Sequence, residues 1–374
     1  MTIRRLAAAA GHYLLFAATY GVAMFVCISW AEQEYHASLL GGVYLYVLLL
    51  VIGVVVHEAG HYLAARWQGM HVLQVMLFGI ELHLTRRGMR IRRQPFRRRR
   101  MRGYVMAYPR SDRPIRRQVI LMVLGGPLAN LILATLLGGA LFVSGLPAHQ
   151  EWLVAAMLLN LGMGFSNLLP RNTEWKSDGA ILREWWKQPA DQPLLPYDRL
   201  TTLSLEGTTN DGLPEQDLVA LEQGSPIEQL VALWYRLKAD QERGDWQMAT
   251  HRRNQLVALK EQVDPALLAR LSELTALMEA ELDFSQAMHD QDADALEATQ
   301  KAAAPVWVSP WQRPRAQALV AALRCDEARR DACLQTSERH ARAAIDASVA
   351  PSESRLRDYI LAISPSRAGA RSCS

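Results

Sequence analysis

The stretch that decides the fold runs from Leu39 to Ala65 and reads LLGGVYLYVLLLVIGVVVHEAGHYLAA. It is longer than the roughly 20 apolar residues that a helix needs to cross a lipid bilayer, so we predict a transmembrane helix here. This helix nevertheless carries His57, Glu58 and His61. Because ionisable side chains at membrane depth cost free energy and seldom serve packing alone, these three residues indicate a functional site.

The spacing of the two histidines is typical of a metal site. Residues four apart share one face of a helix and lie about 6 Å apart along its axis, so His57 and His61 can bind one ion together. Zinc suits neutral imidazole, and a catalytic zinc site has three protein ligands and a water molecule. Glu58 can reach that water without binding the metal, as a general base does. The alternative is a chance motif on a soluble helix, which the apolar run 51–56 directly before it disfavours.

Apolar segments predict four membrane spans. They cover about residues 13–30, 39–65, 119–143 and 152–169. The basic loop 86–117 contains fourteen arginines and one acidic residue, whereas the connections 31–38 and 144–151 contain neither lysine nor arginine. Short loops rich in lysine and arginine stay in the cytoplasm. We therefore expect this loop and both chain termini on the cytoplasmic side.

This orientation supplies a candidate for the third metal ligand. His57 and His61 lie toward the cytoplasmic end of their span, and the fourth span ends on the same side shortly before Asp178. We predict that the Asp178 carboxylate completes a His-His-Asp zinc site. His71 and His83 stay open as alternatives, although neither has a partner at ligand spacing.

Two further features accompany the spans. Residues 72–84 alternate loosely between apolar and polar side chains around Gly79, and residues 104–108 resemble another strand, so we expect a small membrane-associated β element. Asn130 is the only strongly polar side chain of the third span. It either forms a hydrogen bond between helices or takes part in the active site.

The two halves of the chain differ in charge. Residues 1–184 hold 20 lysines and arginines against 9 acidic residues, a net charge of +11, and residues 185–374 hold 21 against 28, a net charge of −7. We therefore expect a transmembrane domain over 1–184 and an acidic soluble part after it. Prolines predict a linker over 185–214, followed by a helical domain over 215–350 and a tail over 351–374.

The helical domain shows a weak repeat. Helical periodicity predicts helix pairs at about 226–262, 265–302 and 315–348. Residues 233–249 resemble a degenerate tetratricopeptide (TPR) unit. An all-α, TPR-like stack of this kind suits the binding of a protein partner.

The arginine run Arg97–Arg100 has two interpretations. A basic patch is the electrostatic footprint of nucleic-acid binding, but no interleaved aromatic residues accompany this one. As a topology signal, the same run would contact anionic lipid headgroups. We favour membrane lipid as the partner and expect no nucleic acid.

Three separated motifs resemble the intramembrane zinc metalloproteases of the site-2 protease family, peptidase family M50. They are His57-Glu58-Ala59-Gly60-His61, Gly126-Pro127-Leu128-Ala129-Asn130, and Asn167-Leu168-Leu169-Pro170 with Asp178-Gly179. The motifs follow the order of the family inside apolar segments, over roughly residues 40–185. The sequence differs from many members of the family in one spacing. Seven residues separate Pro170 from Asp178, which is longer than in those members.

The resemblance implies an α-helical integral membrane protease with about four transmembrane helices in domain 1–184. It implies that His57, His61 and Asp178 bind one Zn²⁺ per chain, and that Glu58 activates the water. It also implies that Asn130 helps to hold the substrate carbonyl or its oxyanion. The substrate would be a transmembrane segment of another protein, cleaved for regulated signalling, and the location would be the bacterial inner membrane.

A scaffold is the alternative from another functional class. In that interpretation a membrane anchor holds a structural or vestigial metal site, and the helical repeats carry the function. The Glu58 carboxylate favours catalysis, because a purely structural site does not need it.

Overall fold

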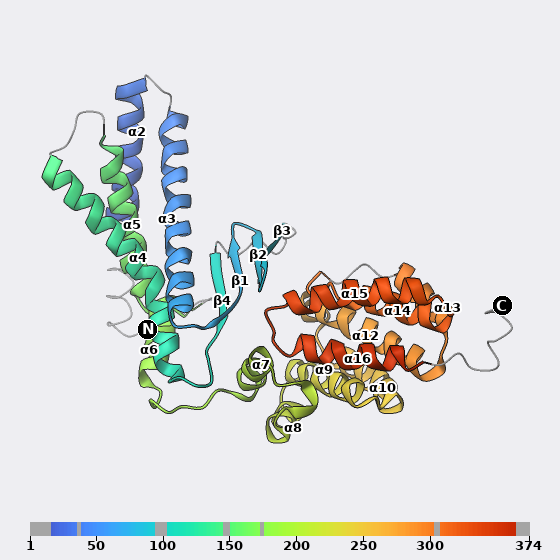
Figure 1. Ribbon diagram of the computed structural model, residues 1–374. Helices are drawn as coiled ribbons and strands as arrows, with labels where there is room; N and C mark the ends of the chain where they lie inside the picture. The colour runs from blue at the N-terminus through green and yellow to red at the C-terminus, as the bar shows by residue number, and fades with distance from the viewer. Residues whose placement is uncertain are drawn as a thin grey trace. The chain divides into compact units, whose positions relative to one another are not determined.

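The computed structural model describes residues 16–35, 39–93, 103–144, 150–172, 176–302 and 307–363. It divides into two compact units (Figure 1). Unit 1 comprises Met1–Leu84 and Met89–Pro193, and unit 2 comprises Thr85–Gly88 and Leu194–Ser374. The described chain is mostly helical and contains one four-stranded sheet. These two features of the predicted fold are confirmed.

Unit 1 is built around two long apolar helices. α3 (Leu39–Trp67) and α4 (Ile115–Ser144) are long and apolar enough to cross a membrane, with mean hydropathies of 2.7 and 2.2 over their most apolar windows. Only 17% and 28% of those windows are buried, whereas the core helix of a soluble protein would be mostly covered. The apolar surface of both helices is therefore available to lipid.

The other two predicted spans correspond to shorter helices. The first is described from Phe16 onward and contains η1 (Ala17–Gly21) and α2 (Val22–Tyr35). The fourth corresponds to α5 (Trp152–Leu168), which is apolar but shorter than α3 and α4. Length and composition thus support two membrane-crossing helices among the described residues, and four spans stay a prediction.

α3 and α4 approach each other closely at the level of the histidine motif. A Cβ atom on Gly60 would lie 2.3 Å from the carbonyl oxygen of Gly125, and one on Gly125 would lie 2.4 Å from the carbonyl oxygen of Gly60. The two backbones therefore touch, which only glycine permits. This contact brings the Gly-Gly-Pro segment of α4 beside the histidines of α3.

The sheet follows α3 directly. Its strands stand in the order β3-β2-β1-β4, and β1 pairs antiparallel with both β2 and β4. β1 and β2 form a hairpin in which Phe78 and Gly79 both have positive φ, as a two-residue hairpin turn requires. The strands are β1 (His71–Leu77), β2 (Ile80–Thr85), β3 (Gly88–Arg93) and β4 (Gly103–Tyr108).

The predicted loop 86–117 is not a single loop. It contains β3, β4 and the first residues of α4. In β3 the apolar Met89 and Ile91 alternate with Arg90 and Arg92. Because half of these residues are arginines, the strand contains no continuous apolar run, and only its two-residue period indicates a strand. Arg92 also forms an ion pair of 2.9 Å with Glu81 of β2, a residue only 2% exposed. The run Arg97–Arg100 lies outside the described residues.

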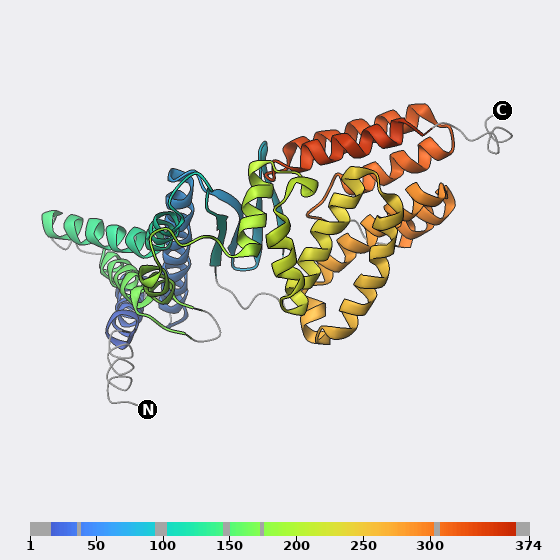
Figure 2. The ribbon, with the colours of Figure 1, turned by 90° about the horizontal axis from the view of Figure 1, so that it is seen from below.

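Unit 2 is a stack of antiparallel helices. α9 and α10 pack against each other, as do α14 with α15 and α15 with α16 (Figure 2). Ser225 caps α9 in a reciprocal pair with Glu228, and Gly244, at φ 73°, ends this helix. The helices are α7 (Pro196–Glu206), η3 (Asn210–Gly212), α8 (Glu215–Glu222), α9 (Pro226–Arg243), α10 (Trp246–Gln262), α11 (Pro265–Arg270), α12 (Ser272–Asp290), α13 (Ala293–Ala302), α14 (Gln312–Leu323), α15 (Glu327–Ala343) and α16 (Val349–Leu361).

The boundaries of the helical domain differ from the prediction at both ends. Within the predicted linker 185–214, α7 begins with Pro196 in its first turn, because proline at this position starts a helix rather than breaking one. Within the predicted tail 351–374, α16 extends to Leu361, and its Leu356 and Ile360 are completely buried. Residues 364–374 lie outside the described part of the chain.

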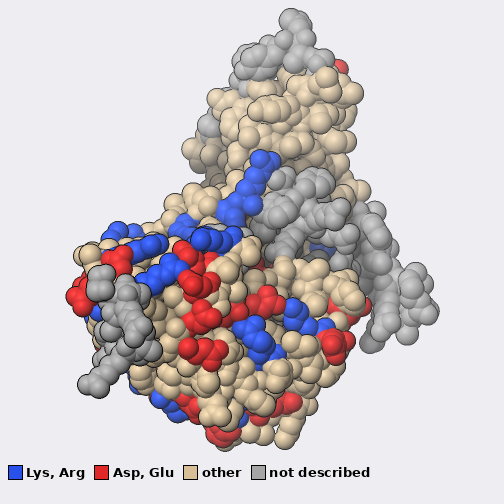
Figure 3. All heavy atoms as spheres, turned by 90° about the vertical axis from the view of Figure 1, so that its right-hand side faces the viewer, with Lys and Arg blue, Asp and Glu red and all other residues tan. Residues whose placement is uncertain are grey.

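The two units also differ in surface. Unit 1 exposes large apolar side chains on its helices, such as Phe25, Leu40 and Phe142. In Figure 3 the helical part of unit 1 is almost entirely tan, whereas unit 2 shows blue and red intermixed. The first surface suits contact with lipid, and the second suits contact with water.

Candidate metal centre

Two imidazoles and one carboxylate converge between α3 and the start of α6 (Asp178–Lys187). The Nε2 atoms of His57 and His61 lie 3.1 Å apart. Asp178 Oδ2 lies 3.0 Å from His57 Nε2 and 3.6 Å from His61 Nε2. Bonds of about 2.0–2.1 Å in a tetrahedral zinc site place the ligand atoms about 3.3–3.4 Å apart. The three atoms therefore have the spacing that one zinc ion requires.

Asp178 reaches the centre although the connection before it is long. An isolated β-bridge pairs Asn172 with Lys176, so the chain leaves α5 and returns to it. A Cβ atom on Gly179 would lie 1.9 Å from the carbonyl oxygen of Leu168, which shows that the first turn of α6 packs directly on the end of α5. The extra residues thus do not displace the carboxylate.

The carboxylate of Asp178 is in the charge state that a metal ligand needs. A carboxylate with the ordinary aspartate pKa of about 3.9 is ionised at neutral pH. Asp178 is therefore an anion at neutral pH, ready to bind a cation.

Each histidine is oriented by its other ring nitrogen. His57 Nδ1 donates a hydrogen bond of 2.7 Å to the side-chain oxygen of Asn130. His61 Nδ1 donates one of 2.9 Å to the carbonyl oxygen of Met122. With protons on both Nδ1 atoms, the Nε2 lone pairs face the centre, as metal-binding histidines require.

Both the oxygen and the nitrogen of the Asn130 side-chain amide form hydrogen bonds, on the side of His57 that faces away from the centre. Asn130 is completely buried, and its amide nitrogen donates to Gly53 O at 2.9 Å and to Asn160 Oδ1 at 2.8 Å. Holding a substrate carbonyl or oxyanion would require the amide to release these partners. The contacts favour a positioning role toward His57. Asn160 also belongs to this hydrogen-bond network, a role that the sequence did not predict. Its only sequence feature of this kind is a polar side chain inside an apolar span.

Two glycines keep room for the chemistry. A Cβ atom on Gly126 would lie 2.4 Å from His61 Nε2 and 2.8 Å from His57 Nε2, where it would fill the space between the two ligand atoms. A Cβ atom on Gly103, the first residue of β4, would lie 2.6 Å from Glu58 Oε1. Both positions therefore need the smallest residue.

Glu58 is buried beside the histidines. It is 7% exposed, and its Oε2 has no hydrogen-bond partner among the described residues. A buried carboxylate oxygen without a partner is costly and seldom serves structure alone. His71 and His83 lie on β1 and β2, and the group of three potential ligands found within the described ranges includes neither.

These features define a candidate metal centre on an apolar helix long enough to cross a membrane. Residues 45–151 match the sequence model of Peptidase family M50, a family of metallopeptidases. The match confirms the resemblance to the site-2 protease family and includes His57, Glu58, His61 and Asn130. Asp178 lies beyond it, so the assignment of this ligand rests on the distances above. No curated protein and no solved structure shows significant similarity to the chain.

Proposed function

We propose that the protein is a zinc-dependent intramembrane endopeptidase that hydrolyses peptide bonds in or near transmembrane segments of other membrane proteins. The observation that carries this proposal is the convergence of His57, His61 and Asp178 beside the buried Glu58. The match to Peptidase family M50 supports the metallopeptidase class. We further propose that cleavage releases a regulator for signalling.

The residues of the site have separate tasks in this proposal. One Zn²⁺ held by His57, His61 and Asp178 would supply a Lewis acid and lower the pKa of a water molecule. Glu58 accepts a proton from the water while the water oxygen forms a bond to the scissile carbonyl carbon. Glu58 then donates this proton to the leaving amine as the C–N bond breaks. Asn130 holds the His57 ring throughout.

The proposed setting is the bacterial inner membrane. Four apolar segments supply the proposed spans, and the Lys/Arg distribution puts both termini in the cytoplasm. The little-buried α3 and α4 support a membrane location. The basic residues between these helices would contact anionic lipid headgroups. The TPR-like helical unit would bind a protein partner.

The competing proposal is a scaffold whose metal site is structural. One observation speaks against it. A structural site gives no reason to bury Glu58 next to the ligands with an oxygen that has no hydrogen-bond partner among the described residues. The two proposals differ in what the loss of this carboxylate would do.

The decisive experiment compares zinc content and cleavage of a model transmembrane substrate, in detergent, for wild type, Glu58→Gln and Asp178→Ala. We expect Glu58→Gln to keep its zinc and to cleave about 10²–10⁴ times more slowly, because only the proton transfer is lost. Asp178→Ala should lose most of its zinc and all measurable activity, because a ligand is gone.

Two exposed carboxylates of unit 1 provide matched controls. Glu184→Gln and Asp112→Ala remove charge away from the centre and should leave zinc content and cleavage unchanged. Cleavage by Glu58→Gln at the wild-type rate would refute the mechanism. A wild type that holds one zinc but cleaves none of several transmembrane substrates would favour the scaffold.

A further inference from the structure

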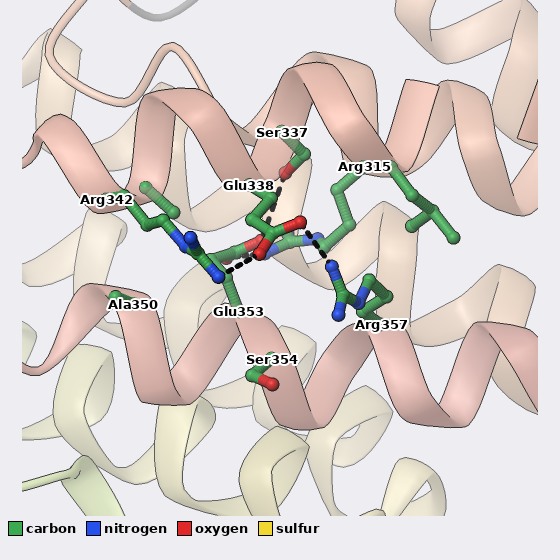
Figure 4. A pocket seen from close by; sticks show the side chains of 10 residues that line it. Arg315, Ser337, Glu338, Arg342, Ala350, Glu353, Ser354 and Arg357 are labelled. Carbon is green, nitrogen blue, oxygen red and sulfur yellow. Dashed lines mark hydrogen bonds and ion pairs between the residues drawn. The ribbon is translucent and has the colours of Figure 1, made fainter. Parts of the chain in front are cut away.

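Unit 2 contains a polar cavity of about 260 Å³ between α14, α15 and α16 (Figure 4). Three arginines and two glutamates line it: Arg315, Arg342, Arg357, Glu338 and Glu353. Leu334, Ala341 and Ala350 supply an apolar wall. The cavity belongs entirely to unit 2 and has no part in the metal centre.

The charges at the base of the cavity balance. Arg315, only 1% exposed, donates to Glu281 at 2.6 Å and to Glu353. Lys238 lies 3.4 Å from Glu281. Two buried cations thus face two buried anions, which leaves no net charge at the base. The Nε atom of Arg315 is nevertheless buried without a hydrogen-bond partner among the described residues.

The charges at the rim do not balance. Arg342 and Arg357 each lie 2.5 Å from an oxygen of the same carboxylate, that of Glu338. Figure 4 shows the two guanidinium groups on either side of Glu338. The Nε atom of Arg357 is also buried without a partner among the described residues. The rim therefore has one positive charge and several N–H donors in excess.

We propose that this cavity binds the carboxylate of a peptide, with Arg342 and Arg357 as its partners. Guanidinium groups bind carboxylates through paired, charge-assisted hydrogen bonds, and the unused donors supply such bonds. The apolar wall accepts the short aliphatic stem that carries the carboxylate. The group can come from the C-terminus of a protein or from an acidic side chain, because both present the same chemistry.

The charge count selects a carboxylate over a phosphate. The rim has two arginines and one glutamate, so one additional negative charge would neutralise it. One carboxylate supplies that charge. A phosphate group carries up to two negative charges, so Glu338 and Glu353, which already line the cavity, would repel it more strongly than they repel a carboxylate.

Calorimetric titration of the full-length protein in detergent micelles tests the proposal. The probes are N-acetyl-Ala-Ala-Leu with a free C-terminus, the same peptide as its amide, N-acetyl-Ala-Glu-Leu-amide, and inorganic phosphate. We expect one or both carboxylate probes to bind, and the uncharged amide and phosphate not to bind. The carboxylate probe that binds more tightly identifies the source of the natural group.

Substitutions at the rim connect binding to the cavity. Arg342→Met and Arg357→Met should each weaken binding by about tenfold or more, because each removes a charge-assisted contact. Glu338→Gln should tighten binding, because it frees both arginines, an effect that a purely structural ion pair would not give. Arg330→Met is the matched control on α15, since Arg330 forms an ion pair with its neighbour Asp331 and does not line the cavity.

Three results would overturn the proposal. These are equal binding of the acid and amide peptides, tighter binding of phosphate than of either carboxylate, and wild-type affinity in both arginine variants. Circular dichroism of each variant shows whether its helices are intact, so a loss of binding through unfolding is recognised. The readout is binding and does not depend on the proposed peptidase activity.

Discussion

At the residue scale, the centre depends on how each side chain near the histidines is used. His57 is fixed through both ring nitrogens, since Nδ1 donates to Asn130 and Nε2 faces Asp178. Glu58, on the same helix, has an oxygen that makes no hydrogen bond to the described residues. His57 is therefore held in place, whereas one oxygen of the proposed general base has no competing hydrogen bond among the described residues.

The positioning role of Asn130 can be separated from an oxyanion role. In Asn130→Ala, the Nδ1–H group of His57 would lose its acceptor, so we expect zinc affinity to fall about 10–100-fold together with activity. Zinc competition with a fluorescent chelator measures the affinity. Thr135→Ala, on an exposed position of the same helix, is the control. If zinc affinity were unchanged while kcat fell, Asn130 would act on the substrate instead.

The position of β4 next to Glu58 gives a second prediction at this scale. A methyl group in Gly103→Ala would meet Glu58 Oε1 at 2.6 Å and must displace the carboxylate. We expect zinc content to stay at the wild-type level and cleavage to fall about tenfold or more, because misplacing a catalytic group by about 1 Å is costly. The control is Gly139→Ala, which would meet nothing within 4 Å. Equal activity of the two variants would contradict the contact.

At the scale of elements, unit 2 is held together by buried charge as well as by apolar packing. Arg315 of α14 joins Glu281 of α12 to Glu353 of α16, and its guanidinium group lies 4.3 Å from the ring centre of Phe284. Burial would raise the pKa of Glu281, but the charges of Arg315 and Lys238 outweigh burial and hold it at about 2. One cation thus connects three helices.

Removal of this cation should destabilise unit 2 in a pH-dependent way. Arg315→Met leaves Glu281 and Glu353 buried without their partner, so we expect a loss of about 3–5 kcal/mol in the free energy of unfolding at neutral pH. Burial already raises the pKa of Glu353 with Arg315 in place, and without Arg315 the pKa of Glu281 rises as well, because the largest charge that opposes the effect of its burial is gone. The folded variant then takes up protons as the pH falls, and its deficit relative to wild type should shrink toward pH 5.

Urea denaturation followed by circular dichroism, at several pH values, measures this deficit. In the wild type, Glu281 should change the free energy of unfolding little between pH 7 and pH 5. Its pKa is lowered, so its contribution to stability is lost only as the pH falls from about 4 toward about 2. Arg330→Met removes an ion pair to an exposed carboxylate and should cost about 1 kcal/mol or less. A deficit that is constant with pH would show that the glutamates are not its cause.

At the scale of the whole molecule, the chain combines a unit with an apolar exterior and a unit with a charged one. Side chains such as Phe142 and Val143 on α4 are 90% and 85% exposed, which water would penalise and lipid would not. The basic residues follow α3 and precede α4, on the side where the histidines lie. The metal centre is therefore expected near the cytoplasmic surface of the membrane.

Alkaline phosphatase insertions test the proposed topology, because this reporter is active only outside the cytoplasm. We expect activity for insertions within 31–38 and 144–151, and none for insertions within 94–102 or at the C-terminus. Immunoblots of each fusion control for expression. Activity of insertions within 94–102 would show that the orientation is the reverse of the proposed one. Inactivity in only one of the two outer connections would show that one of the four predicted spans does not cross the membrane.

The sequence by itself determined the core of the metal site. His57, Glu58 and His61 could be placed together because the helical period fixes residues four apart on one face, whatever the rest of the chain does. The orientation of the spans also led to Asp178, because it put the end of the fourth span in the leaflet of the histidines. The structure brings its carboxylate to 3.0 Å from His57 Nε2.

Only the tertiary structure decided what the remaining polar residues do. Whether Asn130 faces His57 or a substrate depends on contacts with α3 and α5, residues far apart in the sequence, which no local period encodes. The strand β3 and the helix α16 escaped prediction for a similar reason. Arginines mask the alternation of β3, and α16 is stabilised by the neighbours that bury Leu356 and Ile360 rather than by its own sequence.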